Sequence, residues 1–189
     1  MISNYDYLFK IIFLGDSGVG KTSIINRYLY DNFILYSYTV GYNFYNKLIE
    51  YNNELIKIQL WDLSGSEHRI IDKYYKQANG SIIVYDINDR YSFNELKHWT
   101  EEIKNNAPND IKVLLVGNKC DLSERKITKE EGEKIADVFN INFIETSAKN
   151  GYNIHKALDI LIKDIFDNMN KSSIKLKSDV IIGKIDKCF

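Results

Sequence analysis

The sequence predicts an α/β fold in which a doubly wound, mostly parallel sheet of six strands has helices on both faces. Two observations lead to this prediction. Short apolar runs, too short for helices and rich in β-branched residues, alternate along the chain with segments of helical spacing. One pair of runs is joined by two asparagines, which is typical of an antiparallel hairpin rather than a parallel crossover.

The parallel strands are expected where the apolar runs are short and bounded by polar residues. Several of these runs are apolar on both faces, as central strands covered by helices are. The expected strands are residues 9–14, 56–62, 81–86, 112–119 and 141–145.

Helical spacing is clearest in the last third of the chain. Thr128 stands three residues before Glu131, which is the spacing of a capping box, so a helix is expected to begin there. A later segment has apolar residues at i, i+3, i+4 and i+7, which predicts a helix ending near Met169 with one buried face. These apolar residues are Ile154, Ala157, Leu158, Leu161 and Ile165.

The edge strand is expected in the segment NKLIEYNNELIKIQL, where Asn52 and Asn53 separate two alternating runs. Asparagine tolerates left-handed backbone angles, so this pair suits a tight turn. We therefore expect a hairpin whose first strand is antiparallel to the second.

The 189-residue chain is long enough for one sizeable core. We expect a nucleotide-binding domain over residues 1–169 and a flexible tail over residues 170–189, because the tail has no companion elements to pack on. The formal net charge is -1, with 25 basic and 26 acidic side chains, which excludes the basic footprint of a nucleic-acid-binding protein. The 2 cysteines indicate no disulfide framework. No stretch is long and apolar enough to span a bilayer, and the N-terminus has no secretory signal.

The first expected strand runs into GDSGVGKT, residues 15–22, and a helical segment follows. This matches the phosphate-binding loop, in which glycines turn backbone N–H groups toward a β-phosphate and the lysine reaches the β and γ oxygens. The alternative is a glycine-rich turn with a chance lysine. The nucleotide contacts expected here are Asp16, Ser17, Gly18, Val19, Gly20, Lys21, Thr22 and Ser23, with Thr22 also on Mg²⁺.

Two later motifs select the base. In NKCD, residues 118–121, the Asp121 carboxylate can accept both hydrogens of the guanine N1–H and 2-amino group, which adenine does not offer. In ETSAK, residues 145–149, the Ala148 N–H can meet the guanine carbonyl oxygen. Alone, N-K-x-D could be a surface turn, but with the phosphate loop it indicates a guanine nucleotide and argues against an ATP-using kinase. The expected base contacts are Asn118, Lys119, Asp121, Leu122, Ser147, Ala148 and Lys149.

Over residues 5–169 the sequence resembles the Rab family of Ras-superfamily small GTPases, through these motifs and through YYKQANGSIIVYDI, SFNELKHWTEEI and LLVGNKCDL. The resemblance implies the P-loop small GTPase fold and GTP/GDP with Mg²⁺. It implies that Thr39 senses the γ-phosphate and Mg²⁺ and that Gly65 donates its backbone N–H to the γ-phosphate. It also implies that the Asp62 carboxylate binds Mg²⁺, either directly or through one of the metal's other ligands. It also implies that Phe33 packs against the guanine, for which a core position at a helix end is the alternative.

The turn after the second apolar run departs from the family, whose members read W-D-T-A-G-Q-E where this chain has WDLSGSE, residues 61–67. Ser66 stands where the family's glutamine holds the attacking water. The shorter serine cannot reach the same water, so we expect slow intrinsic hydrolysis. The catalytic set is then Lys21, Thr39, Gly65 and Ser66. The alternative is a pseudo-GTPase that holds GTP almost permanently as an effector-binding module.

Both switch loops are shorter than usual for the family, and Asn43 replaces an acidic residue. His68 is expected to be a solvated loop residue, with a role in orienting water as the less favoured reading. Tyr42, Tyr45 and Trp61 suit either an exposed aromatic patch for effectors or half-buried sheet positions.

The partners implied by the resemblance are effectors, exchange factors, activating proteins and a GDP-dissociation inhibitor or escort protein. Cys188 precedes the final residue, so either a single prenyl chain or an unmodified thiol is expected, where Rab tails usually carry two prenylated cysteines. We expect a monomer that is cytoplasmic and reversibly bound to the cytosolic face of an endomembrane.

Overall fold

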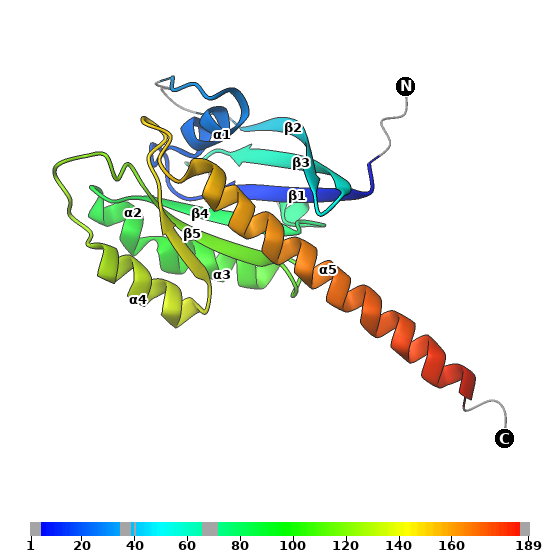
Figure 1. Ribbon diagram of the computed structural model, residues 1–189. Coiled ribbons are helices and arrows are strands. Elements are labelled where there is room, and N and C mark those ends of the chain that lie inside the picture. Colours follow the sequence, from blue (N-terminus) through cyan, green and yellow to red (C-terminus); the bar gives the residue numbers. More distant parts are fainter. Residues whose placement is uncertain (1–4, 35–38, 40, 66–71, 186–189) are drawn as a thin grey trace.

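The computed structural model describes residues 5–34, 39, 41–65 and 72–185, with side chains up to residue 170. Its centre is a six-stranded sheet in the order β2-β3-β1-β4-β5-β6 (Figure 1). The strands are β1 (Tyr7–Leu14), β2 (Tyr42–Tyr51), β3 (Glu54–Leu63), β4 (Gly80–Asp86), β5 (Lys112–Asn118) and β6 (Asn142–Glu145). The pairs β3-β1, β1-β4, β4-β5 and β5-β6 are parallel, which confirms the predicted fold class.

The predicted hairpin is present. Strand β2 pairs with β3 in antiparallel register from Tyr42 opposite Leu63 to Tyr51 opposite Glu54. The two turn residues, Asn52 and Asn53, have φ angles of 51° and 63°. Both values lie in the left-handed region that a two-residue hairpin turn requires and that asparagine tolerates.

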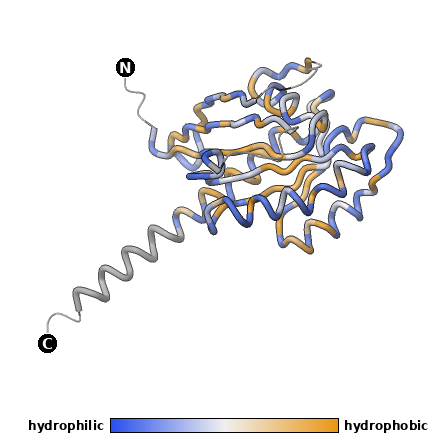
Figure 2. Tube along the Cα trace, turned by 180° about the vertical axis from the view of Figure 1, so that it is seen from behind, coloured by the Kyte–Doolittle hydropathy of each residue, from blue (hydrophilic) through white to orange (hydrophobic). Residues whose placement is uncertain are grey.

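Helices cover both faces of the sheet (Figure 1). They are α1 (Lys21–Tyr30), α2 (Arg90–Asn94), α3 (Leu96–Asn106), α4 (Lys129–Phe139) and α5 (Ile154–Ile185), with a short 3-10 helix, η1 (Asp72–Tyr74). Neighbouring residues of one strand serve opposite layers: Ile11 belongs to the core with α1 and α5, and Ile12 to the core with α3 and α4. Figure 2 shows the resulting concentration of hydrophobic residues along the central strands.

The capping box predicted before α4 is formed. The Glu131 N–H donates to Thr128 Oγ1 over 3.2 Å, and the Thr128 N–H donates to Glu131 Oε2 over 2.8 Å. These bonds satisfy two backbone donors that a helix start leaves without intrahelical partners.

The prediction that the last helix ends near Met169 is wrong, because α5 continues to Ile185. In Figure 1 its second half extends beyond the sheet. The segment after Met169 contains no proline and its lysines and serines are compatible with a helix, so nothing local ends it there. Residues 186–189, with Cys188, lie outside the described part of the chain. Among the helices that the structure describes, none combines the length and the apolar character needed to cross a membrane.

Candidate nucleotide-binding site

A cavity of about 380 Å³ opens where the loops after β1, β3, β5 and β6 meet α1. All of its lining residues were predicted as nucleotide contacts, although the motifs that supply them are far apart in the sequence. They are Ser17, Gly18, Gly20, Lys21, Thr22, Ser23, Phe33, Thr39, Gly65, Asn118, Lys119, Asp121, Leu122, Ala148 and Lys149. The other predicted contacts, Asp16, Val19 and Ser147, are buried behind this lining.

The phosphate loop connects β1 to α1 in a backbone conformation that only glycine fits. Gly15 has a φ of 128°, and a Cβ there would lie 2.1 Å from the Val84 carbonyl oxygen. Gly20 has a φ of 100°, and its Cβ would lie 2.4 Å from Asn118 Nδ2. The loop is therefore held tightly against β4 and β5, and α1 begins at Lys21 immediately after it.

Lys21 is buried at the base of this loop. Its Nζ donates to the carbonyl oxygens of Gly15 over 2.6 Å and Asp16 over 2.8 Å. Burial lowers the pKa of Lys21 to about 8, against the opposing effect of the carboxylates of Asp62 and Asp16. A phosphate anion beside the ammonium group would favour its charged form, so this position suits an anionic ligand.

Three oxygen-bearing side chains converge beside Lys21. Thr22 Oγ1 donates to Asp62 Oδ2 over 2.6 Å and lies 2.8 Å from Thr39 Oγ1, which lies 3.4 Å from Asp62 Oδ2. Burial raises the pKa of Asp62, and the hydrogen bond from Thr22 and the charge of Lys21 oppose that rise. Two hydroxyls and one carboxylate fit the preference of Mg²⁺ for oxygen ligands that it completes with phosphates and water. A divalent cation would also keep the Asp62 carboxylate ionised.

In the base half of the cavity, Asn118 acts as a brace between loops. Its Nδ2 donates to the Val19 carbonyl over 2.9 Å, and its Oδ1 accepts from Thr146 Oγ1 and from the Ala148 N–H over 3.1 and 3.3 Å. The phosphate loop and the ETSAK loop are thus both hydrogen-bonded to Asn118 at the end of β5.

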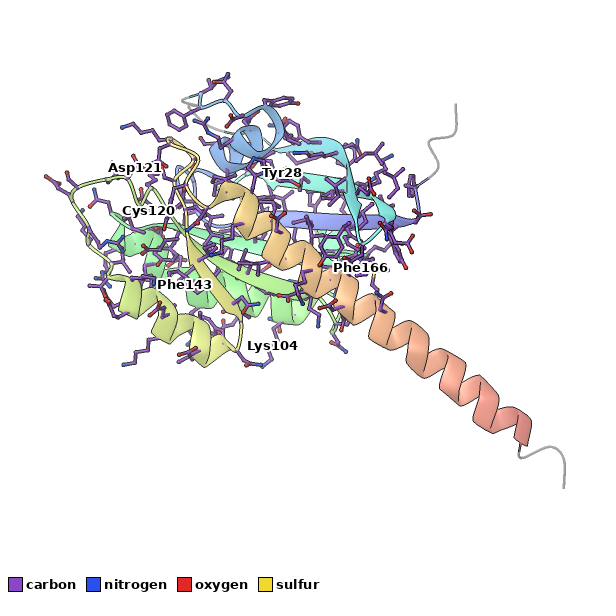
Figure 3. The ribbon with its side chains drawn as sticks, in the orientation of Figure 1. Tyr28, Lys104, Cys120, Asp121, Phe143 and Phe166 are labelled. Atoms are coloured by element: carbon purple, nitrogen blue, oxygen red, sulfur yellow. The ribbon has the colours of Figure 1, made fainter. Side chains whose placement is uncertain are left out.

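Asp121 lies in the loop after β5, next to Cys120 (Figure 3). Its Oδ1 accepts a 2.6 Å hydrogen bond from Ser147 Oγ, which explains why buried Ser147 matters without lining the cavity. The Lys149 ammonium lies 3.8 Å from Asp121 Oδ2. The carboxylate is therefore oriented by two neighbours from the ETSAK loop, as a group that must present both oxygens to a base needs to be.

The chain just after β3 lies close against the phosphate loop at Gly65. A Cβ on this residue would lie 2.3 Å from the carbonyl carbon of Asp16 and 2.4 Å from the Ser17 nitrogen. Just before it, the Ser64 N–H donates to the Gly41 carbonyl over 2.9 Å. Ser66 and His68, whose roles were predicted from the sequence, lie outside the described residues.

Comparison with known proteins identifies the chain. The model of the Ras family matches residues 10–167. Ras-related protein Rab-8 of Diplobatis ommata is 39% identical over 191 residues, which cover 99% of this chain and 90% of that protein. Rab-8B of Homo sapiens is 41% identical over 175 residues (90% and 84%), and Rab-13 of Mesocricetus auratus is 44% identical over 169 residues (87% and 83%). The chain belongs to the Rab family of the Ras superfamily.

This Rab is accordingly a small GTPase of vesicle trafficking that binds GTP and GDP with Mg²⁺. Membership also implies partners of the general classes expected from the sequence: effectors, exchange factors, activating proteins and a GDP-dissociation inhibitor.

The Rab has an aromatic patch beside the site, which we define as Tyr42, Phe44, Trp61 and Tyr74. Trp61 stacks on Tyr42 with ring centroids 5.6 Å apart and contacts Phe44 and Tyr74 at 4.9 and 5.8 Å. Tyr45 is partly buried against the core with α1 and α5 instead, which is the half-buried sheet position that the sequence offered as its alternative. Successive residues of a strand face opposite sides, so Phe44, next to Tyr45, is on the exposed side together with Tyr42.

Phe33 combines the two roles that the sequence left open. It lines the cavity and also packs, partly buried, against the core with α1 and α5. Its position after α1 places it at the border between this core and the cavity.

Sequence reasoning missed residues that orient the site of this Rab from other elements. The Trp99 indole N–H of α3 donates to Asp16 Oδ1 over 2.9 Å, and both residues are buried. Asp86 at the end of β4 holds the Lys119 ammonium at 2.6 Å. The position of Asp86 at a strand end was a usable signal, whereas nothing near Trp99 in the sequence pointed to the phosphate loop.

Proposed function

We propose that this Rab is a GTP/GDP switch whose intrinsic hydrolysis is slow. The sequence of its switch turn carries the proposal: Ser66 follows Gly65, which abuts the phosphate loop, where the family has glutamine. Serine has a side chain two carbon–carbon bonds shorter, and a single hydroxyl cannot replace the amide at the same water. Losing one positioned contact in phosphoryl transfer should lower the rate by about 10- to 100-fold.

The proposed residue roles follow the geometry of the cavity. Lys21 and the loop around it bind the phosphates, and Thr22, Thr39 and Asp62 hold Mg²⁺. The base lies between Asp121, Ala148 and Phe33. In this arrangement Thr39 and Gly65 sense the γ-phosphate, because Thr39 lies beside Thr22 and Gly65 beside the phosphate loop.

Single-turnover hydrolysis of the full chain tests the rate. The variant Ser66→Gln should hydrolyse GTP about 10- to 100-fold faster than the natural protein. Ser64→Ala, which restores the family's residue at a neighbouring position of the same turn, is the matched control and should leave the rate low. An unchanged rate in Ser66→Gln would contradict the proposal.

A second candidate is a pseudo-GTPase that remains bound to GTP and acts as an effector-binding module. The observation that favours this candidate is that three positions in one turn differ from the family: Leu63, Ser64 and Ser66. Three changes in a catalytic loop fit a loss of turnover better than one neutral change would. The nucleotide that copurifies separates the candidates: mainly GTP indicates the module, and mainly GDP indicates turnover. An activating protein that donates its own glutamine would restore turnover in the first candidate.

The remaining proposals concern partners. The exposed aromatic patch is proposed as an effector contact, since Tyr42 and Phe44 are 48% and 41% exposed and lie beside the switch residues Gly41 and Thr39. We propose a monomer in which residues 1–169 bind nucleotide and residues 170–189 act as the tail. Prenylation of Cys188 would place it reversibly on the cytosolic face of an endomembrane, and intact mass measured on protein from its own cells tests that modification.

A further inference from the structure

Arg27 of α1 is largely buried although it carries a charge: its side chain is 14% exposed. Each of its three guanidinium nitrogens donates hydrogen bonds. Nε donates to the Ala148 carbonyl over 2.9 Å, and Nη2 donates to the Lys149 carbonyl over 2.6 Å. Two consecutive carbonyls of the ETSAK loop are therefore held by one side chain from a helix 121 residues earlier in the chain.

The third nitrogen of Arg27, Nη1, binds the chain segment at the end of α1, on the other side of the proposed base site. Nη1 donates to the Asp31 carbonyl over 2.8 Å and to Asp31 Oδ1 over 3.1 Å. Asp31 caps the end of α1 in a left-handed conformation, with a φ of 49°, and stands two residues before Phe33. Phe33 and Ala148 both line the cavity. Arg27 thus joins the two chain segments between which the base lies.

The chemistry of arginine suits this arrangement. A planar guanidinium presents its donors in a fixed fork, so it can hold several acceptors at once, whereas a lysine ammonium is a point charge on a flexible stem. The bonds are also charge-assisted, which makes them stronger than bonds between neutral groups. The Ala148 carbonyl shares a rigid peptide plane with the Lys149 N–H, so anchoring the Ala148 and Lys149 carbonyls restricts the movement of this part of the ETSAK loop, which also carries the Ala148 N–H.

We infer that Arg27 is a positioning residue for guanine recognition. It holds the Ala148–Lys149 backbone in place, so that the Ala148 N–H, which donates to Asn118 Oδ1 over 3.3 Å, can share its hydrogen with the 6-oxo group of the base. The same helix begins at Lys21 on the phosphates, so Arg27 makes the base contact depend on the position of α1. This inference rests on the proposed binding of the base between Asp121, Ala148 and Phe33.

The test measures nucleotide release and base discrimination on the full chain with Mg²⁺. Arg27→Ala should release GDP about tenfold faster, as expected for lost charge-assisted hydrogen bonds, and Arg27→Lys should be intermediate. The positioning role is read from the dissociation constants of GDP, 6-thio-GDP and IDP. The preference for GDP over 6-thio-GDP should shrink by about threefold in Arg27→Ala, since sulfur is the weaker acceptor and the loop that carries the Ala148 N–H is no longer held in place. The preference over IDP, which reports the 2-amino contact with Asp121, should not change.

Arg90→Ala is the matched control. Arg90 also binds a carboxylate and a backbone carbonyl, those of Glu131 and Lys126, but it ties α2 to the start of α4, and neither helix lines the cavity. The Arg90→Ala variant should release GDP at the natural rate and keep the natural preferences for GDP over 6-thio-GDP and over IDP. If Arg27→Ala weakens all three nucleotides in parallel, or releases GDP at the natural rate, the inference is overturned. If the alanine variant does not fold, the same release rates and dissociation constants are measured on Arg27→Lys and compared with those of the natural protein. Failure of the natural protein to bind GDP tightly would instead contradict the proposed function.

Discussion

The hydrogen bond between Trp99 and Asp16 should contribute strongly to stability, and Trp99→Phe removes it. Trp99 is 1% exposed and Asp16 is 8% exposed, so water replaces the lost donor poorly. A hydrogen bond to a carboxylate contributes about 2 kcal/mol, and the smaller ring leaves unfilled space that costs about 1 kcal/mol. The free energy of unfolding should therefore fall by about 3 kcal/mol. For a domain of this size that lowers the melting temperature by about 6–12 °C.

Trp61→Phe is the matched control for this change. Trp61 loses the same atoms on substitution, but its Nε1 is buried with no hydrogen-bond partner among the described residues. Thermal unfolding followed by circular dichroism at a fixed, saturating concentration of GDP and Mg²⁺ compares the two variants, because bound nucleotide itself stabilises the fold. Equal losses of melting temperature in Trp99→Phe and Trp61→Phe would refute the contribution assigned to the Asp16 bond.

Three further predictions concern the cavity. The pKa of Lys21 is lowered to about 8 by burial, so the unfolded state binds more protons above that pH. The stability of the nucleotide-free protein should therefore rise between about pH 8 and 10.5 relative to Lys21→Met, as denaturant unfolding at several pH values would show; parallel curves would contradict it. Gly65→Ala should weaken a non-hydrolysable GTP analogue about tenfold more than GDP in binding titrations, because its Cβ would lie 2.3 Å from the Asp16 backbone. Equal weakening would argue against γ-phosphate sensing. Asp121→Asn should shift the preference in competition binding from guanine to xanthine nucleotides, and retained GTP affinity would count against the base assignment.

Local chemistry explains which parts of the fold and site the sequence could predict. The phosphate loop requires glycines where left-handed angles and close packing occur, and Gly15 and Gly20 have both. The hairpin was predictable because Asn52 and Asn53 are residues that the turn itself selects. In each case the residue type reflects the left-handed backbone angle that its own position requires, which is a local constraint.

The parts that could not be predicted depend on contacts between distant segments. Arg27 and Trp99 act on loops 121 and 83 residues away, and neither stands in one of the nucleotide-binding motifs. The sequence left the exposure of Tyr45 open because two aromatics, Phe44 and Tyr45, are adjacent in a strand, and only the register decides which one faces outward. The helix continues after Met169 to Ile185 because nothing in the local sequence ends it.

The turn at Asn52 and Asn53 has a consequence at the opposite end of its hairpin. Strand β2 runs from Tyr51 beside the turn to Tyr42 in the aromatic patch, a length of about 30 Å at the usual rise per residue. Inserting or deleting one residue in the turn would slide β2 by one position along β3, which is itself fixed by its pairing with β1. Because side chains alternate, the slide would turn Tyr42 and Phe44 toward the interior and present Tyr45 to solvent. The length of a two-residue turn, remote from any nucleotide contact, thereby determines which chemical surface this Rab offers to other proteins.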